Sequence, residues 1–100
     1  MNILVTGASR GIGRAIALGL KQIGNVFGTA RDESLLKSLN LAGYCLCDLS
    51  FENDLVKLGN FIKDNKIDVL VNNAGEYIYS AVDENDLQKI NYIYLQLIKK

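Results

Sequence analysis

The sequence predicts an α/β fold in which a parallel β-sheet carries helices on both faces. Apolar segments of strand length alternate with amphipathic segments of helix length along the 100 residues. The strand segments are continuously apolar, which is typical of strands buried on both faces. With right-handed crossovers, four such βα units predict a doubly wound, three-layer α/β/α sheet with strand order 3-2-1-4.

The composition limits the classes of function open to this chain. One hundred residues make one domain, and 11 basic against 11 acidic residues leave no net charge to favour nucleic acid or an anionic membrane. Histidine is absent, so we expect neither a histidine-activated nucleophile nor a histidine-ligated metal. No apolar run reaches the roughly 18 residues of a membrane span, and the first residues do not resemble a signal peptide. We therefore expect a cytoplasmic protein.

The cysteines agree with that location. Cys45 and Cys47 are the only two, and their spacing places them on one face of a strand. Two ligands are too few for a structural zinc site. We interpret them as small apolar residues of a buried strand in a reducing compartment.

Residues 2–6 form the first predicted strand, and residues 11–23 form the helix that follows it. The helix is predicted from an apolar stripe at helical spacing, made by Ile12, Ile16, Leu20 and Ile23. Gly24 follows the last apolar position, where glycine commonly ends a helix.

A glycine-rich turn joins this strand to its helix. Gly7, Gly11 and Gly13 stand at the spacing G-x3-G-x-G. Glycine adopts positive φ and lets the backbone approach a ligand, and the free N–H groups at a helix start suit a phosphate. The turn therefore predicts a phosphate site, and the alternative is a tight strand-to-helix turn without a ligand.

The next units repeat the pattern. Apolar segments at 25–29, 44–47 and 67–71 are predicted as the second, third and fourth strands. A short helix is predicted at 33–39, with an apolar face made by Leu35, Leu36 and Leu39.

Two longer helices complete the prediction. The helix at 51–65 is predicted to follow an N-cap at Ser50 and to bury Phe51, Leu55, Leu58 and Ile62. The last helix is predicted to start after Asp83 or Asn85 and to run to the C-terminus through Leu87, Ile90, Tyr94 and Leu97.

Polar and glycine-rich segments follow all four predicted strands. They are the turn at 6–13, Arg31, Asp48 and the segment Asn72–Gly75. The carboxyl ends of parallel strands meet at one edge of the sheet, where α/β proteins bind their ligands. The sequence therefore predicts one ligand site at this edge.

Four motifs carry a resemblance to a known family. They read TGASRGIG at 6–13, CDLS at 47–50, NNAG at 72–75 and IN at 90–91. In this order and spacing, the whole chain resembles the N-terminal part of the short-chain dehydrogenase/reductases, close to the ketoacyl-acyl-carrier-protein reductase type. The resemblance implies the N-terminal half of a Rossmann-type domain that binds a nicotinamide dinucleotide.

The resemblance also implies roles for the matching residues. Asp48 and Leu49 would line the adenine pocket. The pyrophosphate would lie on the first turn, near Gly7, Ser9, Arg10, Gly11, Ile12 and Gly13. The alternative for Asp48 is a turn or cap aspartate ahead of Ser50.

The last two motifs would continue the site toward the nicotinamide. Asn73, Ala74 and Gly75 would pass under the adenosine ribose and the nicotinamide side, while Asn72 would hold the central strand ends together. Asn91 would be the catalytic asparagine, which supports a water in the proton relay. The alternatives are a strand-end turn and a buried helix asparagine.

Two arginines favour NADP over NAD. NAD sites use an acidic side chain near the end of the second strand for the ribose 2′-OH, whereas a 2′-phosphate suits arginine. Arg31 stands at that strand end and Arg10 in the glycine turn. Asp32 is the counter-argument, since an acid one position along could still reach the ribose.

The family's catalytic tyrosine, lysine and serine have no counterpart in these 100 residues. No tyrosine is followed four positions later by lysine. We therefore interpret the chain as the cofactor-binding half of an NADP-dependent oxidoreductase that is inactive alone. The alternatives are a truncated, catalytically inactive nucleotide-binding module and an interaction piece.

An isolated half would leave surfaces uncovered. Strand 67–71 would be an unpaired edge, and the last helix would expose a face. We expect the chain to be marginally stable or to associate there with another copy or with a complementing C-terminal half.

Overall fold

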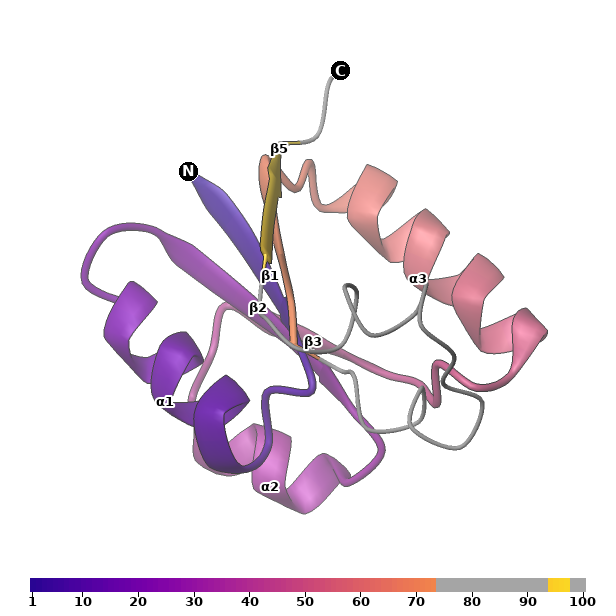
Figure 1. The fold of residues 1–100 in the computed structure, drawn as a ribbon, viewed down its shortest axis with the longest axis horizontal. Coiled ribbons are helices and arrows are strands. Elements are labelled where there is room, and N and C mark those ends of the chain that lie inside the picture. The colour runs from indigo at the N-terminus through magenta and orange to yellow at the C-terminus, as the bar shows by residue number, and fades with distance from the viewer. Residues whose placement is uncertain (74–93, 98–100) are drawn as a thin grey trace, which may run out of the picture.

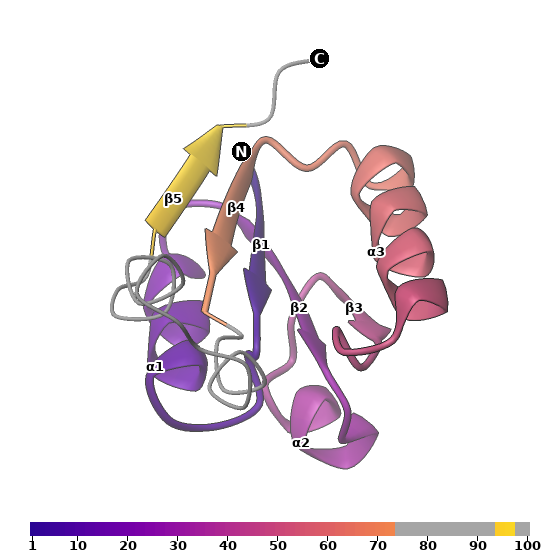
Figure 2. The same cartoon turned by 45° about the vertical axis from the view of Figure 1, so that its right-hand side comes forward.

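The computed structural model describes residues 1–73 and the backbone of residues 94–97, and it contains one five-stranded sheet. The strand order is β3-β2-β1-β4-β5 (Figure 2). The parallel strands are β1 Asn2–Thr6, β2 Asn25–Ala30, β3 Gly43–Leu46 and β4 Val69–Asn72, and β5 Tyr94–Leu97 pairs antiparallel with β4. The predicted parallel order 3-2-1-4 is confirmed.

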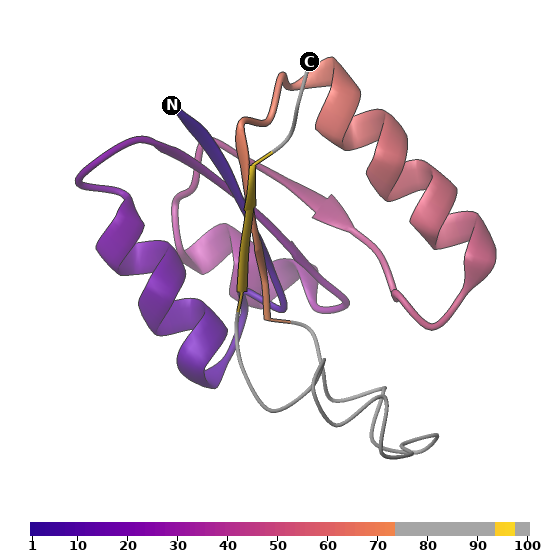
Figure 3. The same ribbon diagram turned by 45° about the horizontal axis from the view of Figure 1, so that its top comes forward.

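Helices cover both faces of the sheet, as expected for a doubly wound fold. They are α1 Gly11–Leu20, α2 Glu33–Ser38 and α3 Glu52–Asp64. α1 and α2 lie on one side of the sheet and α3 lies on the other (Figures 1 and 3).

The central strand β1 serves both cores because its side chains alternate between the faces. Ile3 and Val5 belong to the cluster that includes Ala17 of α1 and Leu36 of α2. Leu4 belongs to the opposite cluster, which holds Phe27, Cys45, Cys47, Leu58 and Ile67. This explains why the strand is apolar at every position from 3 to 5.

The predicted apolar stripe of α1 is wrong at both ends. The helix ends at Leu20, and the side chains of Ile12 and Ile23 are 65% and 64% exposed. The face toward the sheet is instead made by Gly13, Ile16, Ala17 and Leu20. Small residues at two of these positions let the helix approach the strands closely.

The prediction that Gly24 ends this helix is also wrong. Lys21 is the C-cap of α1. Gly24 instead passes close to the first residue, since an added Cβ would lie 2.6 Å from the Met1 carbonyl oxygen.

The predicted start of α3 is corrected as well. Phe51 is the N-cap and makes no side-chain cap hydrogen bond. The Ser50 hydroxyl donates to Asp48 Oδ1 instead. Phe51 and Leu55 are 60% and 49% exposed, so burial falls on Leu58 and on the partly buried Phe61 and Ile62.

The prediction of a final helix through Tyr94 and Leu97 is wrong, because these residues are in β5. The rest of that predicted helix, including Leu87 and Ile90, lies outside the described residues. β5 pairs with the open side of β4 in the register Asn72↔Tyr94 to Val69↔Leu97. Unpaired backbone groups on an edge strand favour such pairing, and the expected unpaired β4 edge is therefore absent.

Candidate functional site: the carboxyl edge of the sheet

The glycine turn, residues 6–13, has the backbone geometry that only glycine adopts easily. Gly7 has φ 64° and Gly11 has φ 55°. Gly11 is open to its surroundings, since an added Cβ would meet nothing within 4 Å among the described residues. The turn therefore curves at Gly7 and presents an uncrowded backbone at Gly11.

Among the described residues, no side chain caps the start of α1. Arg10 is the N-cap, with φ −143° and ψ 159°, and it makes no side-chain cap hydrogen bond. The first turn of the helix carries no acidic residue. Free N–H groups and the positive end of the helix dipole favour an anion at this position.

Gly13 fixes where α1 sits relative to the strand ends. A Cβ at this position would overlap the Gly7 carbonyl oxygen and the Asn73 side-chain nitrogen. Asn73 Nδ2 donates to the Gly7 carbonyl oxygen at 3.3 Å. The glycine turn, the helix and the end of β4 therefore interlock at one point, where no side chain fits.

Thr6 is the polar centre of this interlock. Its side chain is buried, with 2% exposed. The Thr6 hydroxyl donates to Asn72 Oδ1 at 3.1 Å and accepts the Asn73 backbone N–H at 2.9 Å. This pair of bonds ties the carboxyl end of β1 to that of β4, as the sequence predicted for Asn72.

The glycine turn is also held against β2. The Ala8 N–H donates to the Thr29 carbonyl oxygen at 3.0 Å. An added Cβ at Gly28 would lie 3.0 Å from Ala8 Cβ and 2.8 Å from Leu41 Cδ1. A backbone hydrogen bond and the close packing of Ala8 on Gly28 therefore hold the turn against β2.

The turn after β2 contains an aspartate held by a serine two residues later. Asp32 Oδ1 accepts the Ser34 hydroxyl at 2.7 Å and the Leu35 N–H at 3.1 Å, which makes Asp32 the N-cap of α2. These two bonds lower the pKa of Asp32, and the positive charge of Arg10 contributes in the same direction.

The turn after β3 repeats the arrangement. Asp48 Oδ1 accepts the Ser50 hydroxyl at 2.6 Å and the Ser50 N–H at 3.0 Å. These bonds lower the pKa of Asp48, with a further contribution from the charge of Arg31. The Asp48 N–H donates to Asp54 Oδ2 at 2.7 Å, which attaches the turn to the first turn of α3.

Sequence reasoning missed Ser34 and Asp54, and it gave Ser50 a different partner. The signal was present as the repeated pattern Asp-x-Ser at 32–34 and 48–50. A side chain of this type commonly bonds the backbone or hydroxyl two residues ahead. We call these two segments the acidic turns.

The structure places most of the sequence-predicted site residues at the carboxyl edge. Leu49 packs against the core on the α3 side, and the Ile12 side chain is exposed. Gly7, Ser9, Arg10, Gly11, Gly13, Arg31, Asp48 and Asn73 lie in the segments that follow β1, β2, β3 and β4. Ala74, Gly75 and the predicted catalytic Asn91 lie outside the described residues.

The cysteines are free and buried. Burial raises the pKa of the Cys47 thiol to about 11, with a further contribution from Cys45. Within residues 1–73, no group of three His, Cys, Asp or Glu side chains has the arrangement of a metal site. In the same part of the chain, no helix has the length and hydropathy needed to cross a membrane.

Comparison with known proteins shows the family. A family model described as short chain dehydrogenase matches residues 1–95. An uncharacterised short-chain type dehydrogenase/reductase of Sinorhizobium fredii is 37% identical over 102 residues, covering 97% of this chain and 41% of that protein. A 2-dehydro-3-deoxy-D-gluconate 5-dehydrogenase of Pseudoalteromonas atlantica is 38% identical over 95 residues, covering 82% of this chain and 37% of that protein.

A solved structure agrees with these relatives. A metagenomic short-chain oxidoreductase in complex with NADP superimposes with a TM-score of 0.66 and 37% identity, over 75% of this chain and 39% of that one. The chain spans about two fifths of the length of the relatives it matches. The family model, the relatives and the parallel sheet all agree. The chain therefore belongs to the short-chain dehydrogenase/reductase family.

Proposed function

We propose that this chain is the cofactor-binding portion of an NADP-dependent oxidoreductase that interconverts a carbonyl and an alcohol. The observation that carries the proposal is the fixed glycine turn. Its backbone is open at Gly11, and it leads into a helix start that offers free N–H groups. The same edge carries two exposed arginines, Arg10 and Arg31.

The pyrophosphate would lie against the glycine turn. The backbone N–H groups from Gly11 to Gly13 would face its oxygens, with Ser9 and Arg10 beside them. Both Gly7 and Gly11 already have positive φ, so these two backbone conformations are set before binding. Preorganisation of this kind reduces the entropic cost of binding.

The adenosine end favours NADP over NAD. Asp32, the candidate for a ribose 2′-OH, is engaged as the N-cap of α2. Arg10 and Arg31 lie near enough to the acidic turns to lower the pKa of Asp32 and Asp48, respectively. A 2′-phosphate would bind between these arginines, while Asp48 and Leu49 would border the adenine.

The reacting end rests on the resemblance to the family. Ala74 and Gly75 would continue the cofactor groove from Asn73, and Asn91 would support a water of the proton relay. Bound NADPH supplies the hydride in this chemistry. Residues 1–100 contain no Tyr-x3-Lys, so we expect the chain alone to bind the nucleotide without turnover.

The partner of this portion would be the segment that completes the sheet. Relatives are more than twice as long, and β4 is the strand at which their remaining strands would add. A complementing C-terminal half, or another copy, would therefore add at β4 by displacing the four-residue β5.

The alternative function is a nucleotide-binding module without catalytic activity. For either function we propose a cytoplasmic location, which agrees with the two free, buried thiols.

Calorimetric titration of the chain with adenosine 2′,5′-bisphosphate and with 5′-AMP tests the proposal. We expect the bisphosphate to bind more tightly and Arg31→Ala to reduce that preference by roughly 10- to 100-fold, the value of a charge-assisted phosphate contact. Lys37→Ala, an exposed charge on α2, is the matched control and should change nothing. Equal binding of both nucleotides would contradict the choice of NADP, and no binding of either would contradict the proposed function itself.

A further inference from the structure

The strand β3 forms one edge of the sheet in the part of the chain that the structure describes. β3 pairs with β2 only, and the described part of the chain adds no strand beyond it. Its sequence, Gly43-Tyr44-Cys45-Leu46, contains no charge and no proline. Such an edge is a template for pairing with another strand, and proteins usually protect it.

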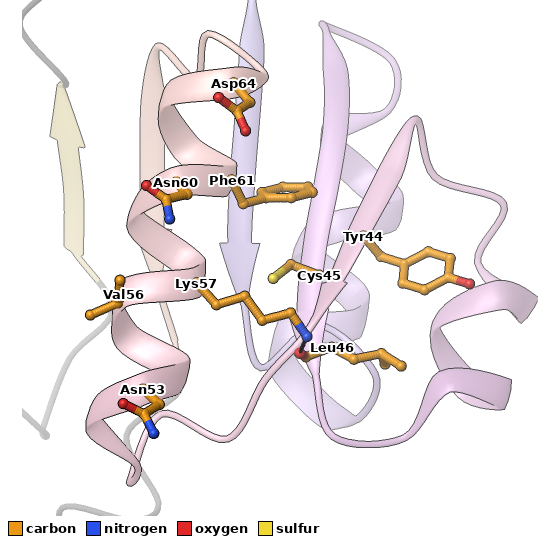
Figure 4. A pocket seen from close by; sticks show the side chains of 9 residues that line it. All are labelled: Tyr44, Cys45, Leu46, Asn53, Val56, Lys57, Asn60, Phe61 and Asp64. Atoms are coloured by element: carbon orange, nitrogen blue, oxygen red, sulfur yellow. Dashed lines mark hydrogen bonds between the residues drawn. The ribbon is translucent and has the colours of Figure 1, made fainter.

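A groove runs between this edge and α3. Its volume is about 680 Å³. It is lined on the strand side by Tyr44, Cys45 and Leu46, and on the helix side by residues that include Lys57 and Phe61 (Figure 4).

Lys57 crosses this groove. Its side chain extends from α3 to β3, and Nζ donates to the Leu46 carbonyl oxygen at 2.6 Å (Figure 4). That carbonyl belongs to the same peptide group as the Cys47 N–H, which donates to Ala30 on β2 at 3.1 Å. Because the C=O and N–H of a trans peptide group point in opposite directions, the Leu46 carbonyl faces the open side of the edge.

We propose that Lys57 prevents β3 from pairing with β3 of a second copy of this chain. The ammonium occupies a backbone acceptor that an incoming strand would need. In a symmetric antiparallel pair, the Leu46 carbonyl of each copy would have to exchange its bond to Lys57 for a bond to the incoming strand. Lys57 therefore opposes pairing by occupying this acceptor in both copies.

The position on α3 matters more than the charge alone. Lys63 lies on the same helix and is exposed, and its ammonium makes no hydrogen bond within the described part of the chain. Replacing it removes the same charge from the same helix without uncovering Leu46. Lys63→Met is therefore the matched control for Lys57→Met, which keeps the apolar stem and loses the donor.

Sedimentation velocity over a range of protein concentrations tests the proposal. We expect Lys57→Met to strengthen self-association roughly tenfold, the value of a hydrogen bond to the freed Leu46 carbonyl, whereas Lys63→Met and Lys57→Arg, which keep a donor at position 57, behave as the parent chain. Hydrogen exchange should show concentration-dependent protection of the outward-facing Tyr44 and Leu46 amides in Lys57→Met.

Two results would overturn the proposal: unchanged association of Lys57→Met, or association without protection of these two amides. If Lys57→Met loses its folded circular dichroism spectrum, Lys57→Ala replaces it, since alanine favours the helix and also removes the donor. Self-association and amide protection of that variant then test the proposal in the same way.

Discussion

The glycine turn and the acidic turns lie at the same edge of the sheet, but they are built in different ways. The glycine turn is fixed by the hydrogen bonds of the buried Thr6 hydroxyl and by close packing at Gly13, where no side chain fits. The acidic turns are fixed by exposed serine–aspartate hydrogen bonds at Asp32 and Asp48. The site therefore combines a region that belongs to the core with a region that belongs to the surface.

Mutations in the two regions should therefore affect different properties of the chain. Changes in the glycine turn should reduce the free energy of unfolding and nucleotide affinity together, because the same contacts serve both. Changes in the acidic turns should alter which nucleotide binds while leaving the fold in place. The predictions below test this division, beginning with the largest expected effect.

Gly13→Ala should have the largest effect. Its Cβ would overlap the Gly7 carbonyl oxygen and the Asn73 side chain, so α1 has to move away from the strand ends. We expect a loss of roughly 1–3 kcal/mol in unfolding free energy, together with the loss of nucleotide binding. Urea denaturation and calorimetric titration measure the two effects.

Gly19→Ala is the control on the same helix. An added Cβ there meets nothing within 4 Å among the described residues, so we expect a gain of about 0.5–1 kcal/mol and unchanged binding. Equal stability of the two variants would contradict the close packing inferred at Gly13.

Thr6→Val should have an intermediate effect. Valine keeps the shape and removes the hydroxyl that joins Asn72 to Asn73. Losing the bonds of this buried hydroxyl should cost roughly 0.5–1.5 kcal/mol. Thermal unfolding measures the loss, and Thr6→Ser, which retains the hydroxyl, should recover much of it; equal losses in both variants would assign the effect to packing.

Lowering the pH should have the smallest effect on the stability of the folded chain. The pKa values of Asp32 and Asp48 are lowered in the folded chain, so their contribution is present above the unfolded pKa of about 3.9 and is lost as the pH falls through the lower folded values. Ser34→Ala and Ser50→Ala should weaken this dependence, because the serine hydroxyls are the largest cause of each shift. Melting temperatures measured from pH 2 to pH 7 test this, and an unchanged acid dependence in both variants would contradict it.

The strands were predictable because a continuous run of apolar residues indicates a buried strand, whichever apolar residues the run contains. β1 matches its predicted bounds, since a strand buried on both faces is apolar at every position. The face of α1 was predicted wrongly because periodicity favours large side chains such as Ile12, whereas close approach to the sheet depends on Gly13 and Ala17.

Competition between partners explains the remaining errors. Ser50 was expected to cap α3, but the Asp48 carboxylate takes its hydroxyl. Segment 94–97 was expected to be helical from its apolar spacing, but the open backbone of β4 offers it a strand partner. Local patterns do not reveal which of two acceptable partners a group will take.

The central place of β1 has a consequence for how the chain is made. β1 is synthesised before both of its neighbours in the sheet, and one of them, β4, begins only at Val69. The Asn2 N–H, for example, bonds the carboxylate of Asp68, 66 positions later. During translation β1 can pair only with β2 until β4 emerges. The pace at which the ribosome adds residues 30–72 therefore sets how long this apolar strand stays exposed to chaperones and to other nascent chains.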